Sequence, residues 1–236
     1  PRLLAPPLPT NLRRRTLASR GAWHTRPMRS GQLHGAARSG MALAGVAAMA
    51  YQLGTLSDRP GFRVANFASF FTIQSNVLAA VMLLAAALVR PAERSALFDA
   101  VRGAVTLAIV ITGVVFALLL QGLQEQLDTH IPWVDLVVHT LVPLAVAVDW
   151  LLDPPRHVLP RGVVLAWLAY PLLWFSYTLV RGAAVGWYPY PFVDADRLCY
   201  GRIALNAIVL ALAFAAGGLV LNELGRLRAR RPAVRG

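Results

Sequence analysis

Long apolar stretches recur along this chain and are separated by short polar segments. A helix that crosses roughly 30 Å of hydrocarbon needs about 20 mostly apolar residues, and a helix satisfies its own backbone groups in lipid. The stretches do not alternate between apolar and polar positions as barrel strands do. The pattern therefore predicts an all-α polytopic membrane bundle of six transmembrane helices, over residues 39–56, 64–89, 101–122, 132–152, 162–181 and 201–222.

The segments outside these spans have a different composition. Proline, glycine and charged residues punctuate the connections between spans, as expected of turns. Residues 1–38 are rich in Pro, Arg, Ser and Gly, which predicts a disordered basic arm, and residues 223–236 form a basic tail. The spans themselves are predicted to be unbroken. No internal repeat of the kind found in transporters is visible in the sequence.

The charge distribution predicts the orientation of the bundle. The 236 residues are 57% hydrophobic and 14% charged, with a formal net charge of +12 and a mean hydropathy of +0.54. Most basic residues lie in the arm, the tail and alternate loops; Arg94 lies between the second and third spans, and Arg102, at the start of the third, is counted with the same side. This pattern indicates membrane topology rather than nucleic-acid binding, and the positive-inside rule places both termini in the cytoplasm. We therefore expect a cell-membrane protein whose arm and tail contact anionic lipid headgroups.

Metal and cofactor sites are not indicated by the sequence. The single cysteine, Cys199, has no partner within the chain for a disulfide, and no Cys/His spacing is typical of a zinc site. No flavin or nucleotide motif is visible. We therefore predict that the protein uses no metal and no cofactor.

Ionisable side chains within membrane spans are costly, so each of them is a candidate for function. His139 lies about a third of the way along the fourth predicted span, and Asp135 precedes it by four residues. This spacing puts the two side chains on one face of a helix. Asp135 is therefore predicted to orient the imidazole of His139. Asp149 lies nearer the cytoplasmic end of the same span.

The segment FFTIQSN, residues 70–76, is unusually polar for a membrane span. Ser69, Thr72, Ser75 and Asn76 follow one another at the spacing of a helical face, and such a polar stripe is not expected to face lipid. Thr72 lies about eight residues into the second span, or roughly 12 Å at 1.5 Å per residue. His139 lies at a similar depth in the fourth span. The sequence therefore predicts that Thr72 and His139 face each other.

A hydroxyl, an imidazole and a carboxylate at one depth are the components of a nucleophile, a base and an orienting group. Thr72, His139 and Asp135 are the predicted catalytic residues, and Asn76, Gln74 or Arg202 is expected to stabilise an oxyanion. The loop from about Gly182 to Tyr200, which contains the aromatic string at residues 187–192, is predicted to pack over the outer mouth of the bundle. The candidate substrate-binding residues are Asn76, Gln74, Ser75, Arg202, Trp187 and Tyr190.

A simpler interpretation of the polar stripe stays open. Hydroxyl side chains in membrane helices commonly bond to a carbonyl one turn earlier or to a neighbouring helix. On this interpretation the stripe only joins helices together.

These motifs resemble a known family. FFTIQSN in the second span, WVDLVVHTLVP in the fourth and WYPYPF before the sixth are similar to the androgen-induced-gene-one-like membrane proteins, and closer to their bacterial counterparts, the Pr-six-Pr group. The resemblance covers about residues 40–222. It implies a threonine hydrolase of fatty-acid esters with Thr72 as nucleophile and His139 as base. Asp135 stands where the eukaryotic pattern has an asparagine.

Three functions are therefore considered. The first is a membrane lipid-ester hydrolase with the bilayer and a fatty-acyl ester as its partners. The second is a small proton-coupled transporter with a relay through Asp135, His139 and Asp149, which unbroken spans without a repeat disfavour. The third is a non-catalytic scaffold or lipid-binding protein. The distance between Thr72 and His139 discriminates among them.

Overall fold

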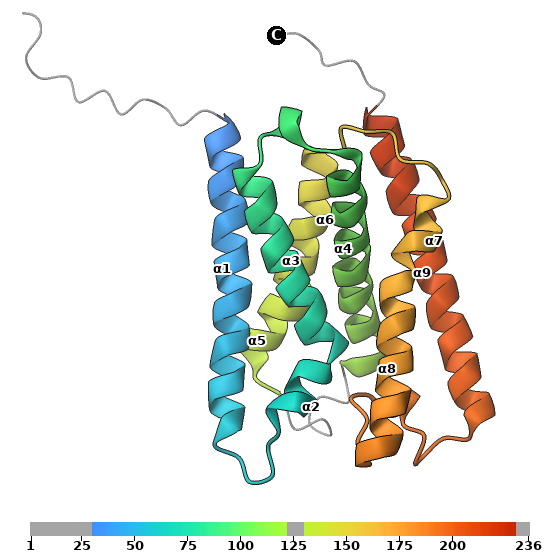
Figure 1. Ribbon diagram of the computed structural model, residues 1–236. Coiled ribbons are helices and arrows are strands. Elements are labelled where there is room, and N and C mark those ends of the chain that lie inside the picture. The colour runs from blue at the N-terminus through green and yellow to red at the C-terminus, as the bar shows by residue number, and fades with distance from the viewer. Residues whose placement is uncertain (1–29, 122–129, 230–236) are drawn as a thin grey trace, which may run out of the picture.

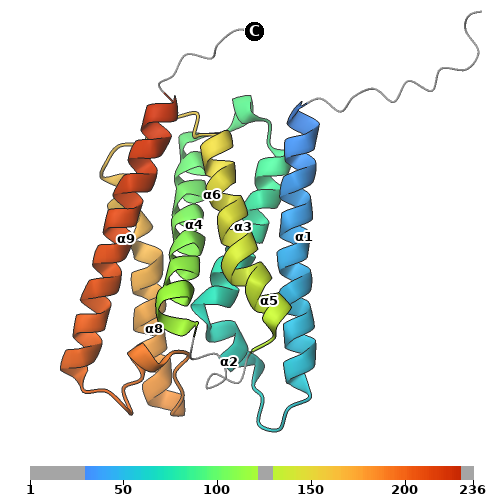
Figure 2. The same ribbon diagram turned by 180° about the vertical axis from the view of Figure 1, so that it is seen from behind.

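The protein is an elongated bundle of helices. The computed structural model describes residues 30–121 and 130–229, and all regular elements in these ranges are helical. Figure 1 shows the long helices side by side, and Figure 2 shows the same arrangement from behind. The first described helix begins and the last one ends at the same end of the bundle.

The elements follow one another along the chain with short connections. The α-helices are α1 (Ser30–Ser57), α2 (Val64–Ser69), α3 (Phe71–Leu88), α4 (Ala96–Val115), α5 (Pro132–Leu136), α6 (Val142–Leu152), α7 (Val163–Trp167), α8 (Ala169–Val185) and α9 (Tyr200–Ala229). A π-helical turn, Phe116–Leu120, extends α4, and a second one, Val137–Leu141, joins α5 to α6. Two 3-10 turns lie at Pro91–Glu93 and Pro191–Val193.

Within the described residues, five helical stretches are long and apolar enough to cross a membrane. They are Phe71–Leu88, Ala96–Leu120, Pro132–Leu152, Val163–Val185 and Tyr200–Ala229. Large apolar side chains such as Leu88, Leu118 and Val180 are exposed on the outside of the bundle. An exposed apolar surface of this kind is expected where helices face lipid. The chain is thus an all-α, membrane-embedded bundle.

The helix α1 corrects the predicted boundary of the basic arm. Residues 30–38, assigned above to a disordered arm, are helical, and α1 packs along α3. Arg38 is buried in that packing because it donates hydrogen bonds to two carboxylates, Asp149 and Asp153. The rest of the predicted arm lies outside the described residues.

A buried group of charges joins four parts of the chain at the end of the bundle where α1 begins. We call Arg38, Arg94, Arg102, Asp149 and Asp153 the arginine–aspartate cluster. Asp149 accepts from Arg38 at 2.7 Å and from Arg102 at 2.8 Å, and Asp153 accepts from Arg38 at 2.5 Å and from Arg94 at 2.7 Å. On the sequence pattern, both Arg94 and Arg102 count with the loop between the second and third spans. Arg94 does lie in the connection before α4, whereas Arg102 lies within α4, which begins at Ala96, and is only 2% exposed because its charge is paired.

The second predicted span is broken rather than continuous. Between α2 and α3, Phe70 has an extended backbone with φ −64° and ψ 130°. The carbonyl of Ser69, which the break releases from the helix ladder, accepts a hydrogen bond from Trp174 Nε1 at 3.0 Å. Phe70 itself packs edge-on against Trp187 and Tyr190. Contacts from α8 and the following loop therefore stabilise the break.

The last helix is longer than predicted. Residues 223–229, assigned to the basic tail, continue α9, because the sequence has no proline before Pro232 in this stretch and Arg226 pairs with Glu223 one turn earlier. Residues 230–236 lie outside the described residues. The fifth predicted span is also divided, since a turn at Leu168 separates α7 from α8.

Candidate functional site

The hydroxyl of Thr72 and the imidazole of His139 lie side by side inside the bundle. Thr72 is in the first turn of α3, directly after the break at Phe70, and is 7% exposed. Its Oγ1 lies 3.2 Å from Nε2 of His139. This is hydrogen-bond distance for a hydroxyl and an imidazole. The structure thus brings together the two residues that the sequence placed at one depth.

The position of His139 depends on two π-helical turns. His139 lies in the turn Val137–Leu141, and its ring stacks on Phe116 of the turn Phe116–Leu120, with centroids 3.7 Å apart and an interplanar angle of 6°. A π-helical turn changes the direction of side chains relative to an α-helix, and such turns are frequent at functional sites. Here they bring the imidazole onto the aromatic ring and toward Thr72.

Asp135 lies near His139 but is held by another histidine. Its Oδ1 is 3.6 Å from His139 Nδ1, which is beyond hydrogen-bond distance. His139 Nδ1 is buried and has no hydrogen-bond partner in the described part of the chain. The other carboxylate oxygen of Asp135 lies 2.8 Å from Nδ1 of His130. His130 was not among the sequence-predicted residues, because it lies just before the predicted span. Its spacing of five residues before Asp135 was the only signal.

Tyr190 completes the immediate surroundings of Thr72. Its hydroxyl accepts a hydrogen bond from Thr72 N at 3.3 Å and also lies 3.3 Å from Thr72 Oγ1. Tyr190 is 6% exposed, and burial raises the pKa of its phenol, although contacts with the Thr72 hydroxyl and backbone oppose the rise. The phenol therefore keeps its proton at neutral pH and is a hydrogen-bond donor.

The loop that carries Tyr190 packs against the bundle. Tyr190 lies on Trp174 and stacks on Phe192, and Val193 is fully buried. Trp187, the second aromatic residue predicted to bind substrate, lies elsewhere. It packs on Phe70 and beneath the guanidinium of Arg181.

Asn76 and Ser75 join helices. The amide nitrogen of Asn76 donates to the carbonyls of Thr72 at 2.9 Å and Val138 at 3.1 Å. Ser75 Oγ lies 3.0 Å from Thr112 Oγ1 on α4. Both N–H groups of the Asn76 amide are thus bonded within the protein, and neither is available to an oxyanion in this conformation. For these two side chains the helix-joining interpretation fits the contacts.

Gln74 and Arg202 do not reach the pair. Gln74 Nε2 donates to the carbonyl of Ala68 at 3.0 Å, and its Oε1 accepts from Tyr170 at 3.4 Å. Arg202 is exposed at the start of α9. Neither residue lines the cavities beside Thr72.

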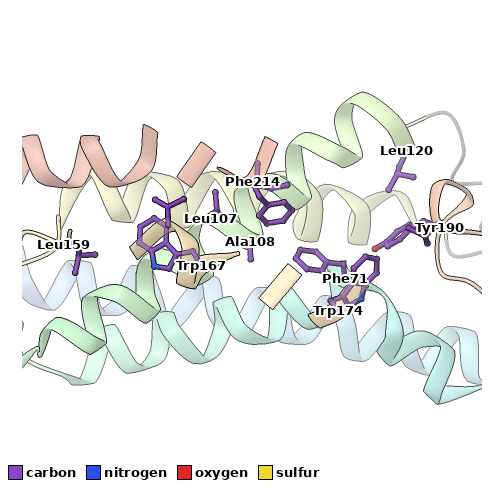
Figure 3. Close-up of a cluster of buried hydrophobic side chains, with 12 residues drawn as sticks. Phe71, Leu107, Ala108, Leu120, Leu159, Trp167, Trp174, Tyr190 and Phe214 are labelled. Carbon is purple, nitrogen blue, oxygen red and sulfur yellow. The ribbon is translucent and has the colours of Figure 1, made fainter. Parts of the chain in front are cut away.

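Two cavities meet at Thr72. The larger, of about 80 Å³, is almost entirely apolar, and Figure 3 shows part of its lining, with Phe71, Trp174 and Tyr190 gathered near Phe214. The smaller, of about 40 Å³, is also mainly apolar but has more polar groups in its lining, among them His139, Asp135 and Gln52. Thr72, Tyr190 and Leu120 line both cavities. The hydroxyl of Thr72 therefore lies between an apolar and a more polar space.

Asp149 is remote from this arrangement. It belongs to the arginine–aspartate cluster near the other end of α6, where it accepts from Arg38 and Arg102. Ten residues separate it from His139, which is about 15 Å along a helix. The relay of Asp135, His139 and Asp149 that a transporter would use is therefore not assembled in this structure.

The arrangement has the parts needed for acyl transfer. An imidazole nitrogen lies beside a hydroxyl, as a general base lies beside its nucleophile. The backbone N–H of Thr72, in the first turn of α3, has no carbonyl one turn earlier to bond and donates to the Tyr190 hydroxyl instead. An ester oxygen that displaces this contact would meet two donors, the N–H and the phenol. In the described residues, no three His, Cys, Asp or Glu side chains are grouped so that they would hold a metal ion.

Comparisons of the chain with protein-family models, with curated proteins and with solved structures return no match. The family resemblance therefore depends on the three sequence motifs alone.

Proposed function

We propose that this protein is an integral membrane hydrolase of fatty-acyl esters, with Thr72 as nucleophile and His139 as general base. The observation that carries the proposal is the distance of 3.2 Å between Thr72 Oγ1 and His139 Nε2 at the junction of the two cavities. A threonine that only joined helices would need no imidazole beside it.

The proposed reaction proceeds through an acyl-threonine. His139 Nε2 takes the hydroxyl proton as Thr72 Oγ1 forms a bond to the ester carbonyl carbon. The oxyanion receives hydrogen bonds from Thr72 N–H and the Tyr190 hydroxyl. When the tetrahedral intermediate collapses, the ester C–O bond breaks and the leaving alcohol takes the proton from His139. A water molecule, deprotonated by His139, then attacks the acyl-threonine. The acyl–Oγ1 bond breaks, His139 returns the proton to Thr72 Oγ1, and the fatty acid is released.

The two cavities suggest where the substrate lies. The larger cavity has no charged residue in its lining, so an acyl chain in it removes apolar surface from water or lipid headgroups without burying a charge. The smaller cavity, with His139 and Asp135, suits the leaving alcohol. This division favours esters with an apolar acyl group.

Family membership and the number of spans together determine the orientation of the bundle in the membrane. The resemblance of the Thr72 and His139 motifs to the Pr-six-Pr group supports membership of that family and a sixth span formed by α1. With six spans, both ends of the described chain lie on one side, and the Arg-rich arm and tail favour the cytoplasm. The Thr72 site then lies in the outer half of the membrane.

The orientation is tested with a reporter fused after Gly236. An alkaline phosphatase fused there should be inactive, and a green fluorescent protein fused there should be fluorescent, since only the cytoplasmic side gives this pair of results. The opposite pair would contradict the six-span orientation.

The proposed activity is tested by ester turnover on purified full-length protein. A series of fatty-acyl esters with increasing chain length should be hydrolysed, and Thr72→Val should abolish turnover because it removes the hydroxyl while keeping the side-chain shape. Thr106→Val is the matched control, since Thr106 is also buried, in α4, and its hydroxyl donates to the carbonyl of Arg102 at 2.8 Å within its own helix. Thr72→Val with full turnover would contradict the mechanism. No turnover by the wild type across the series would favour a lipid-binding scaffold.

A further inference from the structure

We infer that His130 is a positioning residue for His139 and acts through Asp135. The inference rests on the proposed function, because it concerns the same imidazole. It depends on three neighbouring side chains: His130 at the edge of the bundle contacts Asp135, Asp135 lies near His139, and His139 lies beside Thr72.

Asp135 faces a different imidazole with each of its oxygens. Oδ2 lies 2.8 Å from His130 Nδ1, and Oδ1 lies 3.6 Å from His139 Nδ1. Asp135 is only 8% exposed, and a buried carboxylate without a donor is costly. The hydrogen bond from His130 satisfies Oδ2 and fixes the plane of the carboxylate. With that plane fixed, Oδ1 faces His139.

The Nδ1 atom of His139 indicates the role of the Asp135 carboxylate orientation. His139 Nδ1 is buried with no hydrogen-bond partner of good geometry among the described residues. The acceptors beside it both belong to Asp135: its backbone carbonyl and its Oδ1, which lies 3.6 Å away. When His139 takes a proton at Nε2, both ring nitrogens become donors. A shift of about 0.6 Å brings Nδ1 and Oδ1 to hydrogen-bond distance, and catalytic hydrogen bonds are often long before substrate binds. His130 thus holds Asp135 ready for the imidazolium.

The chain contains a matched control for this histidine. His157 also binds a buried carboxylate through Nδ1, at 2.9 Å from Asp99 Oδ2, and its side chain is 45% exposed, against 37% for His130. Asp99 lies near the start of α4, at the opposite end of the bundle from α5. Replacing His157 therefore removes the same kind of hydrogen bond without affecting His139.

The experiment measures the tautomer of His139 independently of activity. Full-length protein labelled with ¹⁵N-histidine has five histidines, and the His139→Gln variant identifies the signals of His139. We expect the wild type to carry its ring proton on Nδ1, His130→Ala to show a mixture of tautomers, and His157→Ala to resemble the wild type. His130→Asn should restore the wild-type pattern, since its amide donates from nearly the same place as Nδ1.

Kinetics add the second readout. His130→Ala should lower kcat by about 10-fold, less than the roughly 10²-fold that a 1 Å misplacement of a catalytic group can cost, and leave KM within about 2-fold. His130→Asn should recover most of kcat, and His157→Ala should change neither constant. If the His139 tautomer were unchanged in folded His130→Ala, the positioning role would be wrong even for an active enzyme. If the tautomer changed while the wild type hydrolysed no ester, the proposed function alone would fail.

Discussion

Replacing Thr72 or His139 should each lower kcat for fatty-acyl ester hydrolysis by about 10⁴-fold, and replacing both should be no worse than either change alone. The physical reason is that the hydroxyl and the imidazole act as one unit across their distance of 3.2 Å. Without the base the hydroxyl is a weak nucleophile, and without the hydroxyl the base has no nucleophile to activate. The measurement is kcat for Thr72→Val, His139→Gln and the double variant on one long-chain ester.

The variants are expected to fold, so that a loss of turnover reports chemistry. A hydrogen bond between helices in a membrane is worth about 0.6 kcal/mol on average, and both substitutions keep most of the side-chain volume. Monodisperse protein with an unchanged thermal midpoint in detergent is the control. Losses that multiplied in the double variant would mean that Thr72 and His139 act independently, contrary to the proposed mechanism.

Removing one member of the arginine–aspartate cluster should cause the largest loss of stability. The Asp149 carboxylate lies 2.7 Å from the guanidinium group of Arg38 and 2.8 Å from that of Arg102. Asp149→Ala removes both of these ion pairs. Breaking a buried ion pair in this way costs about 3–5 kcal/mol. The thermal midpoint in detergent should fall by about 10 °C. Glu93→Ala is the control, because its pair with Arg90 is exposed at 3.8 Å and worth about 1 kcal/mol or less.

The same cluster predicts a loss of stability in acid. Burial alone would raise the pKa of Asp153, but hydrogen bonds from Arg38 and Arg94 and the charge of Arg102 hold it below its ordinary value of 3.8. A carboxyl group whose pKa is lower in the folded state contributes stability above the unfolded-state pKa. That stability is lost as the pH falls below 3.8 toward the folded-state value. The thermal midpoint of Asp153→Asn should therefore change less over this range than that of the wild type. Equal acid sensitivity in the two proteins would contradict this assignment.

The lengths of the apolar runs were enough to predict most of the helices. The span 132–152 coincides with the helical stretch Pro132–Leu152, because Pro132 and Asp153 mark its ends in the sequence. The break at Phe70 was not predictable, since neither glycine nor proline marks it. Trp174 and Tyr190, which stabilise the break, come from segments about 100 residues away or more. Tertiary contacts of this range leave no local pattern.

The candidate site was predictable where helical depth alone decides position. Thr72 and His139 lie at the same level of the bundle, as residue counting along the two spans predicted. The roles of their neighbours depend on side-chain contacts that counting does not give. Asn76 and Asp149 were considered as site residues, but the first bonds to two carbonyls and the second to two arginines. The roles of His130 and of the backbone N–H of Thr72 could be identified only from the positions of the helix ends in the structure.

The measurement that tests the central claim most directly is the location of a covalent adduct. Full-length protein in detergent is treated with a long-chain alkyl fluorophosphonate, and the peptide between Arg63 and Arg90 is fragmented in a mass spectrometer. The account predicts a phosphonyl group on Thr72 that is absent from Thr72→Val and strongly reduced in His139→Gln. An adduct on Ser69 or Ser75 instead, or ester turnover by Thr72→Val at the wild-type rate, would contradict the claim that Thr72 is the nucleophile.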